Sequence, residues 1–368
     1  MTDTENVALS IRDAIALGAR HHQAGRLAEA EAVYRAVLKA APDEPAAKHN
    51  LGLIALHSGR EAEAVALIQA SVAARPDNPE FQNSLGAALI LSGRPQEAEG
   101  PLLRALALRP TYEKAIQSIV AHGSREAART ALTAYLAADP SDAIGAAIQL
   151  AAMGAAPPAR ASDAHLLRFY GERAERWGEG NGYRHADLVA EAILAATAPG
   201  SAILDAGCGT GLVGKSIRSH AGHLCGVDLS PEMIGRARAL DVYDELAAGD
   251  LVEFLERDPA AFDGIASAAT LIHFGDLAAV LAAAFTALRP GGLLIFTAFP
   301  DNQNADGYSA GDLSGRAQAG TFRHGREYLR GVARRSGFRT VRVCQEHVEI
   351  DPQTGEWVAG LLLIYQRA

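Results

Sequence analysis

Three carboxylates, each at the end of a short apolar run, are the residues of this chain best suited to chemistry. Asp205 closes the run SAILDA, Asp228 closes HLCGVD, and Asp250 follows Gly249 in the string AAGDL. A carboxylate at the end of a strand can accept hydrogen bonds from the two hydroxyls of a ribose, or from an amino group. The three acids therefore predict a ligand that contains a nucleoside.

A glycine-rich loop follows the first of these acids. In the string LDAGCGTG, Gly207, Gly209 and Gly211 let the backbone pass close beneath a ligand and open a helix. Gly209-x-Gly211-x-x-Gly214, with Asp228 19 residues beyond Gly209, also matches the fingerprint of a dinucleotide site. A sulfonium nucleoside and a nicotinamide dinucleotide therefore both remain open at this point.

The position of Asp205 favours the first of these two cofactor classes. Its carboxylate stands two residues before the first glycine, where it suits an ammonium or sulfonium group and would repel a pyrophosphate. Asp250 is placed to reach an adenine amino group. We keep a nicotinamide-dependent oxidoreductase as the weaker alternative.

Alternating strands and helices must position these acids. Two helical stretches, at 163–177 and 184–197, come first in this half of the chain. The strands are predicted from apolar runs at 201–206, 223–228, 262–269 and 292–299, with helical segments between them. This order is typical of a parallel sheet, in which ligands bind at the carboxyl ends of the strands.

Three strings in this half resemble the motifs of class I S-adenosylmethionine-dependent methyltransferases. They are LDAGCGTG, VDLSPEMI (227–234) and ALRPGGLLIF (287–296), and the likeness spans about 163–368. The resemblance implies a Rossmann-like α/β fold with a seven-stranded sheet in the order 3-2-1-4-5-7-6, whose last strand (357–366) is antiparallel. It also implies S-adenosyl-L-methionine as the cofactor and S-adenosyl-L-homocysteine as its product.

The same resemblance implies cofactor contacts at matching positions of this sequence. Some of these residues are expected to contact the methionine part and the ribose, and others the adenine. A further segment is expected to close over the methionine end. The implied cofactor-binding residues are Asp205, Gly207, Cys208, Gly209, Gly211, Asp228, Leu229, Met233, Asp250, Leu251, Ala268, Tyr183 and Arg184. Among them Cys208 is interpreted as a small residue in a tight loop and not as a nucleophile.

Residues that could face the methyl acceptor lie after the fourth and fifth strands and in the leading helix. A base is needed only where the acceptor keeps its proton until attack. The candidates for the catalytic site are His273, His324, Tyr308, Arg316 and Tyr170, and the segment 301–322 is interpreted as a lid. A structural hydrogen-bonding role remains the alternative for each histidine.

Two absences narrow the choice of acceptor. The string SAAT at 267–270 lacks the Asn/Asp-Pro-Pro-Tyr pattern that methylation of nucleobase or glutamine nitrogens would require, and no cysteine matches a cytosine-methylating nucleophile. The remaining acceptors are a small molecule or a group borne by a peptide or carrier. The sequence does not distinguish an O, N, C or S acceptor atom.

The first half of the chain repeats with a period of 34 residues. Residue types recur in phase across three units at Gly18/Gly52/Gly86, Gly25/Gly59/Gly93, Ala30/Ala64/Ala98, Tyr34/Ile68/Leu102 and Pro42/Pro76/Pro110. We expect the first glycines where two helices cross closely, the second at turns, and the prolines at helix ends. These features resemble the tetratricopeptide repeat, a helix–turn–helix unit that builds an α-solenoid.

The repeats define the predicted domains. The repeat domain covers 1–153, with repeats at 11–44, 45–78 and 79–112, a degenerate unit at 113–142 and a capping helix at 142–153. A linker follows at 154–162, and the methyltransferase domain covers 163–368. The whole layout resembles a bacterial group of tetratricopeptide-repeat-containing methyltransferases. The repeats are expected to bind the substrate or a partner, or to self-associate.

Composition limits the classes of partner. The chain has 368 residues and a net charge of −9, which disfavours nucleic acid. No apolar run reaches membrane-spanning length and the amino terminus is polar, so we expect a cytoplasmic protein without a membrane partner. The three cysteines show no paired metal-ligand spacing, and no metal is predicted. A non-catalytic repeat adaptor with a silent Rossmann-like domain is the alternative function.

Overall fold

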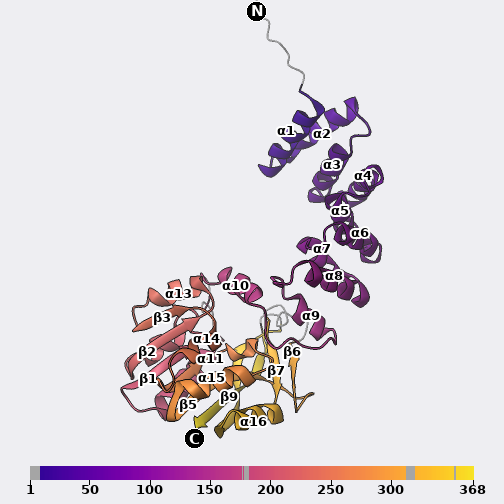
Figure 1. Ribbon diagram of the computed structural model, residues 1–368. Coiled ribbons are helices and arrows are strands. Elements are labelled where there is room, and N and C mark those ends of the chain that lie inside the picture. The colour runs from indigo at the N-terminus through magenta and orange to yellow at the C-terminus, as the bar shows by residue number, and fades with distance from the viewer. Residues whose placement is uncertain (1–8, 176, 178–181, 312–319, 352–353) are drawn as a thin grey trace, which may run out of the picture. The chain divides into compact units, whose positions relative to one another are not determined.

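The computed structural model describes residues 9–175, 177, 182–311, 320–351 and 354–368 of the chain (Figure 1). The described chain divides into two compact units, Met1–Pro140 and Ser141–Ala368. Within the described residues, no helix is both long enough and apolar enough to cross a membrane.

Helical hairpins build the first unit. Its helices are α1 (Ile11–Gln23), α2 (Leu27–Ala40), α3 (Pro45–His57), α4 (Glu61–Ala74), α5 (Pro79–Leu91), α6 (Pro95–Leu108), α7 (Glu113–His122) and α8 (Arg125–Ala138). Each consecutive pair lies within one of the units expected from the 34-residue period. Side chains cap several of these helices: the side chain of Ser10 accepts from Asp13 N, and that of Asn78 accepts from Phe81 N.

The recurring glycines allow the two helices of each repeat to pack closely. A Cβ built on Gly18 would lie 2.6 Å from the ring of Tyr34, and one built on Gly86 would lie 2.5 Å from Leu102. The middle repeat has the same contact between Gly52 and Ile68. The glycine at this position of each repeat therefore leaves room for the large side chain 16 positions later.

A mixed sheet forms the centre of the second unit. Its strands are β1 (Ser201–Ala206), β2 (Ala221–Asp228), β3 (Glu245–Ala248), β4 (Phe262–Ser267), β5 (Leu288–Asp301), β6 (Tyr308–Ala310), β7 (Phe322–Gly325), β8 (Phe338–Ile350) and β9 (Trp357–Arg367). The strands β3, β2, β1, β4 and β5 lie side by side in parallel. The antiparallel strand β9 follows β5, and β8 follows β9.

This path is the predicted order 3-2-1-4-5-7-6, because β9 and β8 take the places of the seventh and sixth strands. The described part of the sheet has nine strands, since β6 and β7 add two. They pair with each other and continue the sheet from the far end of β5, at Phe299–Asp301. Part of the segment interpreted as a lid therefore forms strand β6.

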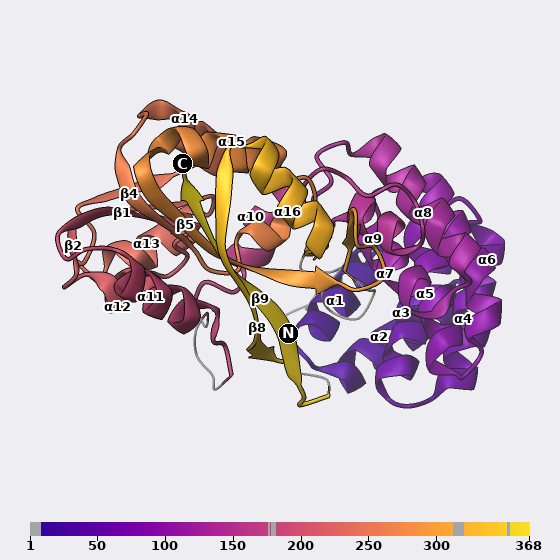
Figure 2. The same cartoon turned by 90° about the horizontal axis from the view of Figure 1, so that it is seen from below.

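Helices cover both faces of this sheet, as Figure 2 shows. The helices of the second unit are α9 (Ala146–Ala152), α10 (Asp163–Gly171), α11 (His185–Ala196), α12 (Leu212–Ile217), α13 (Pro231–Arg238), α14 (Leu251–Arg257), α15 (Ala278–Ala287) and α16 (Arg326–Arg335), with a short 3-10 helix at Leu271–His273. Residues of α14, α15 and α16 share one buried apolar cluster with the sheet. Residues of α11 and α12 form the cluster on the opposite face.

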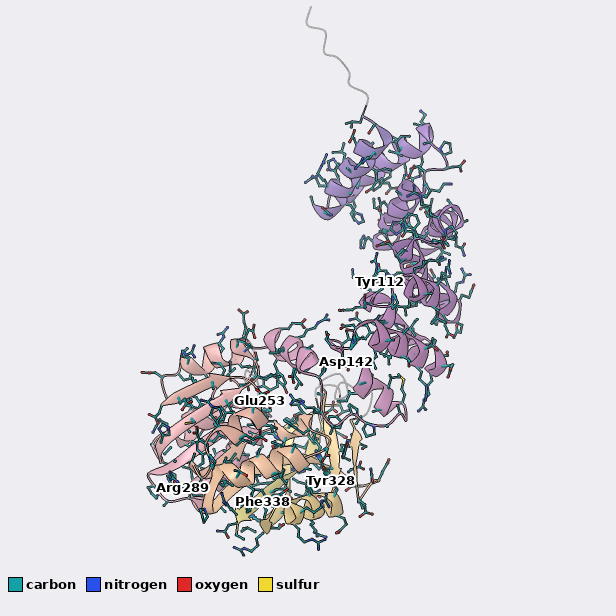
Figure 3. The ribbon with its side chains drawn as sticks, in the orientation of Figure 1. Tyr112, Asp142, Glu253, Arg289, Tyr328 and Phe338 are labelled. Carbon is teal, nitrogen blue, oxygen red and sulfur yellow. The ribbon has the colours of Figure 1, made fainter. Side chains whose placement is uncertain are left out.

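The expected capping helix of the repeats lies within the second unit. Asp142, labelled in Figure 3, accepts hydrogen bonds from Ala146 N at 2.5 Å and Ala147 N at 3.1 Å, and so satisfies the first two amides of α9. Ile148 of α9 packs against Leu166 and Phe322 in one apolar cluster. The contact boundary therefore falls at residues 140/141 and not in the expected linker 154–162.

Candidate cofactor and acceptor site

A cavity opens at the carboxyl ends of β1, β2 and β4. Many of the residues predicted to bind the cofactor or to face the acceptor line it. These are Asp205, Gly207, Cys208, Gly209, Asp228, Leu229, Met233, Asp250, Leu251, Ala268, Tyr183, Tyr170 and His273. The parallel topology brings them together, because the carboxyl ends of parallel strands lie at the same edge of the sheet.

The glycine loop passes directly under this cavity. The amides of Gly207 and Cys208 both donate to the carbonyl of Val227, at 2.8 and 2.9 Å, which turns the loop toward β2. A Cβ on Gly207 would lie 2.1 Å from Thr270 Oγ1, so the close approach requires glycine. Gly211 does not line the cavity; it begins α12 with a φ of 91°.

Asp205 is buried at the floor of the cavity. Its Oδ2 accepts from Gly214 N at 3.1 Å and from the hydroxyl of Tyr243 at 2.7 Å, whereas Oδ1 has no hydrogen-bond partner among the described residues. Burial raises the pKa of this carboxyl to about 7, and the nearby Asp228 adds to the rise. A buried, unpartnered carboxylate oxygen is suited to a cationic ligand.

Asp228 presents the second carboxylate. Its Oδ2 accepts from Gly209 N and its Oδ1 from Ser230 N, both at 2.9 Å. Burial raises the pKa of Asp228, and the two backbone hydrogen bonds oppose that rise. Each oxygen can accept a further hydrogen bond, which is what the adjacent hydroxyls of a ribose require.

An arginine that the sequence reading did not select also lines the cavity. Arg160 Nη1 lies 2.6 Å from Asp250 Oδ2, and the guanidinium lies 5.2 Å from the centre of the Phe274 ring. Burial favours a higher pKa for Asp250, but the hydrogen bonds from Arg160 and from the start of α14 outweigh it and lower the pKa. Arg160 lies in the segment interpreted as a linker, so no motif signalled it.

A histidine and a tyrosine are joined on the acceptor side of the cavity. Tyr170 Oη lies 2.7 Å from His273 Nε2, and His273 Nδ1 lies 2.9 Å from the carbonyl oxygen of Gly320. Only Nδ1–H can donate to that carbonyl, so Nε2 is unprotonated and accepts a hydrogen bond from the hydroxyl of Tyr170. Burial lowers the pKa of His273 to about 4 and keeps the ring neutral.

Aromatic rings extend the wall beside this pair. The ring of Tyr170 lies 5.1 Å from that of Trp177, which lies 5.9 Å from that of Tyr183. Trp177 was not among the predicted site residues. Its position between two cavity tyrosines in sequence is the signal that could have identified it.

Besides Gly211, the structure places three further predicted site residues outside the cavity. His324 Nε2–H donates to the carbonyl of Phe274 at 2.8 Å, and its ring stacks on that of Tyr328, so His324 is buried in the core and does not line the cavity. Tyr308, on β6, packs beside Phe322 of β7 and does not line the cavity. Arg184 donates to the carbonyl of His347 at 3.2 Å, also outside the cavity. Arg316 lies outside the described residues.

Comparisons with known proteins agree with this geometry. A family model for a methyltransferase domain matches residues 204–296, and a tetratricopeptide-repeat model matches 15–79 and 62–113. A ubiquinone biosynthesis O-methyltransferase from Paraburkholderia phytofirmans is 30% identical over 164 residues, 40% of this chain and 67% of the relative. The chain belongs to the S-adenosylmethionine-dependent methyltransferases. A relative of the same name from Xylella fastidiosa is 34% identical over 99 residues, 26% of this chain and 40% of that one.

Solved structures of methyltransferases are also similar. A Burkholderia thailandensis 1,6-didemethyltoxoflavin-N1-methyltransferase with bound S-adenosylhomocysteine is 21% identical, with a TM-score of 0.44, over 56% of this methyltransferase and 87% of that chain. The complex of the Haloferax volcanii Trm112 activator and a methyltransferase matches at 20% identity and a TM-score of 0.44, over 55% and 97%.

The family establishes S-adenosylmethionine as the cofactor of this enzyme, and the tetratricopeptide and Rossmann-like folds predicted from the sequence are confirmed. The cavity fits the cofactor, because Asp205 lines it and has a buried carboxylate oxygen with no hydrogen-bond partner among the described residues, as a cationic group requires. The nicotinamide alternative is set aside.

Proposed function

We propose that this methyltransferase acts on the hydroxyl oxygen of a small, largely apolar acceptor. The observation that carries the proposal is the neutral Tyr170–His273 pair at the cavity wall, with its 2.7 Å hydrogen bond. The names of the relatives, ubiquinone biosynthesis O-methyltransferases, support the same acceptor atom.

Different residues of the cavity bind different parts of the cofactor. When bound, S-adenosylmethionine supplies an electrophilic methyl group on a sulfonium. We propose that Asp205 holds the ammonium of the methionine part, since its Oδ1 is buried without a partner among the described residues. Asp228 binds the ribose hydroxyls, and Asp250 with Arg160 borders the adenine.

The direction of the hydrogen bonds on the other side selects the acceptor. Because the hydroxyl of Tyr170 donates its hydrogen bond to His273 Nε2, the phenol oxygen of Tyr170 is left to accept a hydrogen bond from a ligand. An acceptor hydroxyl that donates to Tyr170 keeps a lone pair free for the methyl group. As the new O–C bond forms, the bond from the methyl group to the sulfonium would break and leave its electron pair on sulfur, while the hydroxyl proton moves to Tyr170 and the Tyr170 proton moves to His273.

The second part of the proposal concerns the function of the tetratricopeptide repeats. We infer that they bind a partner or carrier that bears the acceptor, or associate with a second copy. Localisation in the cytoplasm stays a prediction.

Tyr170→Phe tests the acceptor side, because it removes the hydroxyl and keeps the ring. We expect kcat for a phenolic acceptor to fall by about 100-fold or more, while S-adenosylmethionine affinity changes by less than about threefold. Methyl transfer is measured with radiolabelled cofactor against matched phenols, anilines and thiols. Tyr308→Phe, at a tyrosine outside the cavity, is the control and should keep full turnover. Unchanged turnover in Tyr170→Phe, or label in the nitrogen or sulfur product alone, would refute the proposal.

A further inference from the structure

Three chemically different metal-binding side chains meet at the edge of the sheet. His223 and Cys225 are two residues apart on β2, so their side chains lie on the same face of the strand. Glu245 begins β3 and is the register partner of Cys225 across the strand pair. An imidazole, a thiol and a carboxylate are therefore brought together by strand geometry alone.

The three donor atoms are close enough to share one ion. Cys225 Sγ lies 3.2 Å from His223 Nε2 and 3.8 Å from Glu245 Oε2, and all three donors lie within 4.8 Å of one another. Zinc bonds of about 2.0–2.3 Å in a tetrahedron place neighbouring ligands roughly 3.3–3.8 Å apart. Small side-chain movements would complete the arrangement.

A carboxylate stands behind the imidazole. His223 Nδ1 lies 3.6 Å from Asp244 Oδ2, and that oxygen also accepts from Leu224 N and from Arg218 Nη1, each at 2.7 Å. In metal sites, a carboxylate at one ring nitrogen commonly orients the other toward the ion. Asp244 therefore favours the orientation of His223 that directs Nε2 at Cys225.

We propose that His223, Cys225 and Glu245 form a binding site for a divalent, thiophilic metal ion, with Zn²⁺ as the best match. Nitrogen, sulfur and carboxylate oxygen are the ligand types of zinc. On binding, the Cys225 thiol gives its proton to solvent and a sulfur–zinc bond forms. Two anionic ligands then balance the charge of the ion, and solvent takes the fourth position.

The site would join the edge of the sheet to its interior. Strand β3 has four residues and, within the described sheet, pairs only with β2. An ion held by both strands would secure β3, which leads to Asp250, beside β2, which ends at Asp228. Both of those acids line the cofactor cavity, so metal loading is expected to stabilise that side of the cavity.

Zinc affinity is measured by competition with a chromophoric chelator on the tag-free, full-length chain. We expect one tightly bound ion, and an affinity at least about tenfold weaker in Cys225→Ser, His223→Ala and Glu245→Gln. Cys344→Ser removes a thiol on β8, outside the cluster, and should leave the affinity unchanged. Glu245 is exposed, so Glu245→Gln tests the site with little risk to the fold, which circular dichroism of the metal-free protein verifies.

Cobalt distinguishes this site from other histidines. His22 Nε2 and His57 Nδ1 lie 3.1 Å apart and offer a second place for zinc without a thiol. Cobalt at the proposed site should give a thiolate charge-transfer absorption that Cys225→Ser abolishes and His57→Ala does not. Absence of that absorption in the parent protein, or its persistence in Cys225→Ser, would overturn the proposal.

Discussion

At the scale of single residues, burial determines the properties of the cavity. Asp205 and Asp228 are both held by backbone amides, yet the pKa of each carboxyl is raised because the surrounding protein disfavours their charge. A ligand with a positively charged group would stabilise the ionised form of these carboxylates. The same environment would reject a diphosphate, which agrees with the family to which the chain belongs.

The pKa of Asp205, about 7, predicts that cofactor affinity depends on pH. Only the ionised carboxyl attracts a cation, so affinity should increase as the pH rises through that value. Between pH 6 and pH 8 the increase should be about tenfold. Calorimetric titration of S-adenosylmethionine across this range measures it.

Asp205→Asn should bind the cofactor more weakly and remove this part of the pH dependence. Asp187→Asn, at an exposed position of α11, should keep the parent profile and so accounts for titration of the cofactor itself. A parent profile as flat as that of Asp205→Asn would show that Asp205 does not titrate in this range.

The sequence alone could not distinguish the environments of the two candidate histidines, His273 and His324. His273 and His324 both follow strands and both could reach the cavity in a linear reading. The distinction depends on tertiary packing: His273 is joined to Tyr170, whereas His324 is turned toward the carbonyl of Phe274. Arg160 was missed for a related reason, because only the fold brings it to Asp250.

At the scale of elements, periodicity predicted more than motifs did. The 34-residue repeat located the helix pairs of the first unit, and apolar runs located β1, β2, β4 and β5 to within a few residues. The pair β6 and β7 was missed because each strand has at most four residues. Strands so short carry too little alternation to be recognised.

The repeat glycines give a prediction at this scale. Gly86→Ala should lower the free energy of unfolding by about 1–3 kcal/mol, because the new methyl overpacks against Leu102. Adding Leu102→Ala should cost less than the sum of the two single changes, since the methyl fills part of the space that the leucine leaves. Urea unfolding of the full-length chain measures all three.

A helical glycine without close neighbours provides the matched control. A Cβ on Gly235, in α13, meets nothing within 4 Å. Gly235→Ala should therefore be neutral or stabilise by up to about 1 kcal/mol. If Gly86→Ala behaved in the same way, close packing would not be the reason for glycine in the repeats.

At the scale of the whole molecule, the segment after the repeats belongs to the catalytic unit. The carbonyl of Ala159 accepts from the amides of Gly275 and Asp276, both at 2.8 Å, and Ala161 N donates to the carbonyl of His273 at 2.9 Å. These bonds attach the segment to the loop that carries His273. Composition suggested a linker here because Pro157 and Pro158 interrupt any helix, but a non-helical segment can still be ordered by strand-like pairing.

Two shortened chains separate the role of this segment from that of the repeats. Removal of residues 1–140 should leave S-adenosylmethionine affinity within about threefold of the parent, because no cavity residue is lost. Removal of residues 1–160 should weaken it by about tenfold or more, since the Ala159 bonds and the Arg160–Asp250 pair are lost together. Arg160→Ala in the full chain isolates the contribution of the side chain.

Turnover by the chain that lacks 1–140 then tests what the repeats do. If they present a carrier-bound acceptor, this chain should methylate a free phenol at the parent rate but lose activity on the same phenol attached to its carrier or peptide. The two activities are compared in one assay with radiolabelled cofactor. Equal loss on both acceptors would mean that the repeats support the catalytic unit itself, and equal retention would mean that they do not deliver the acceptor.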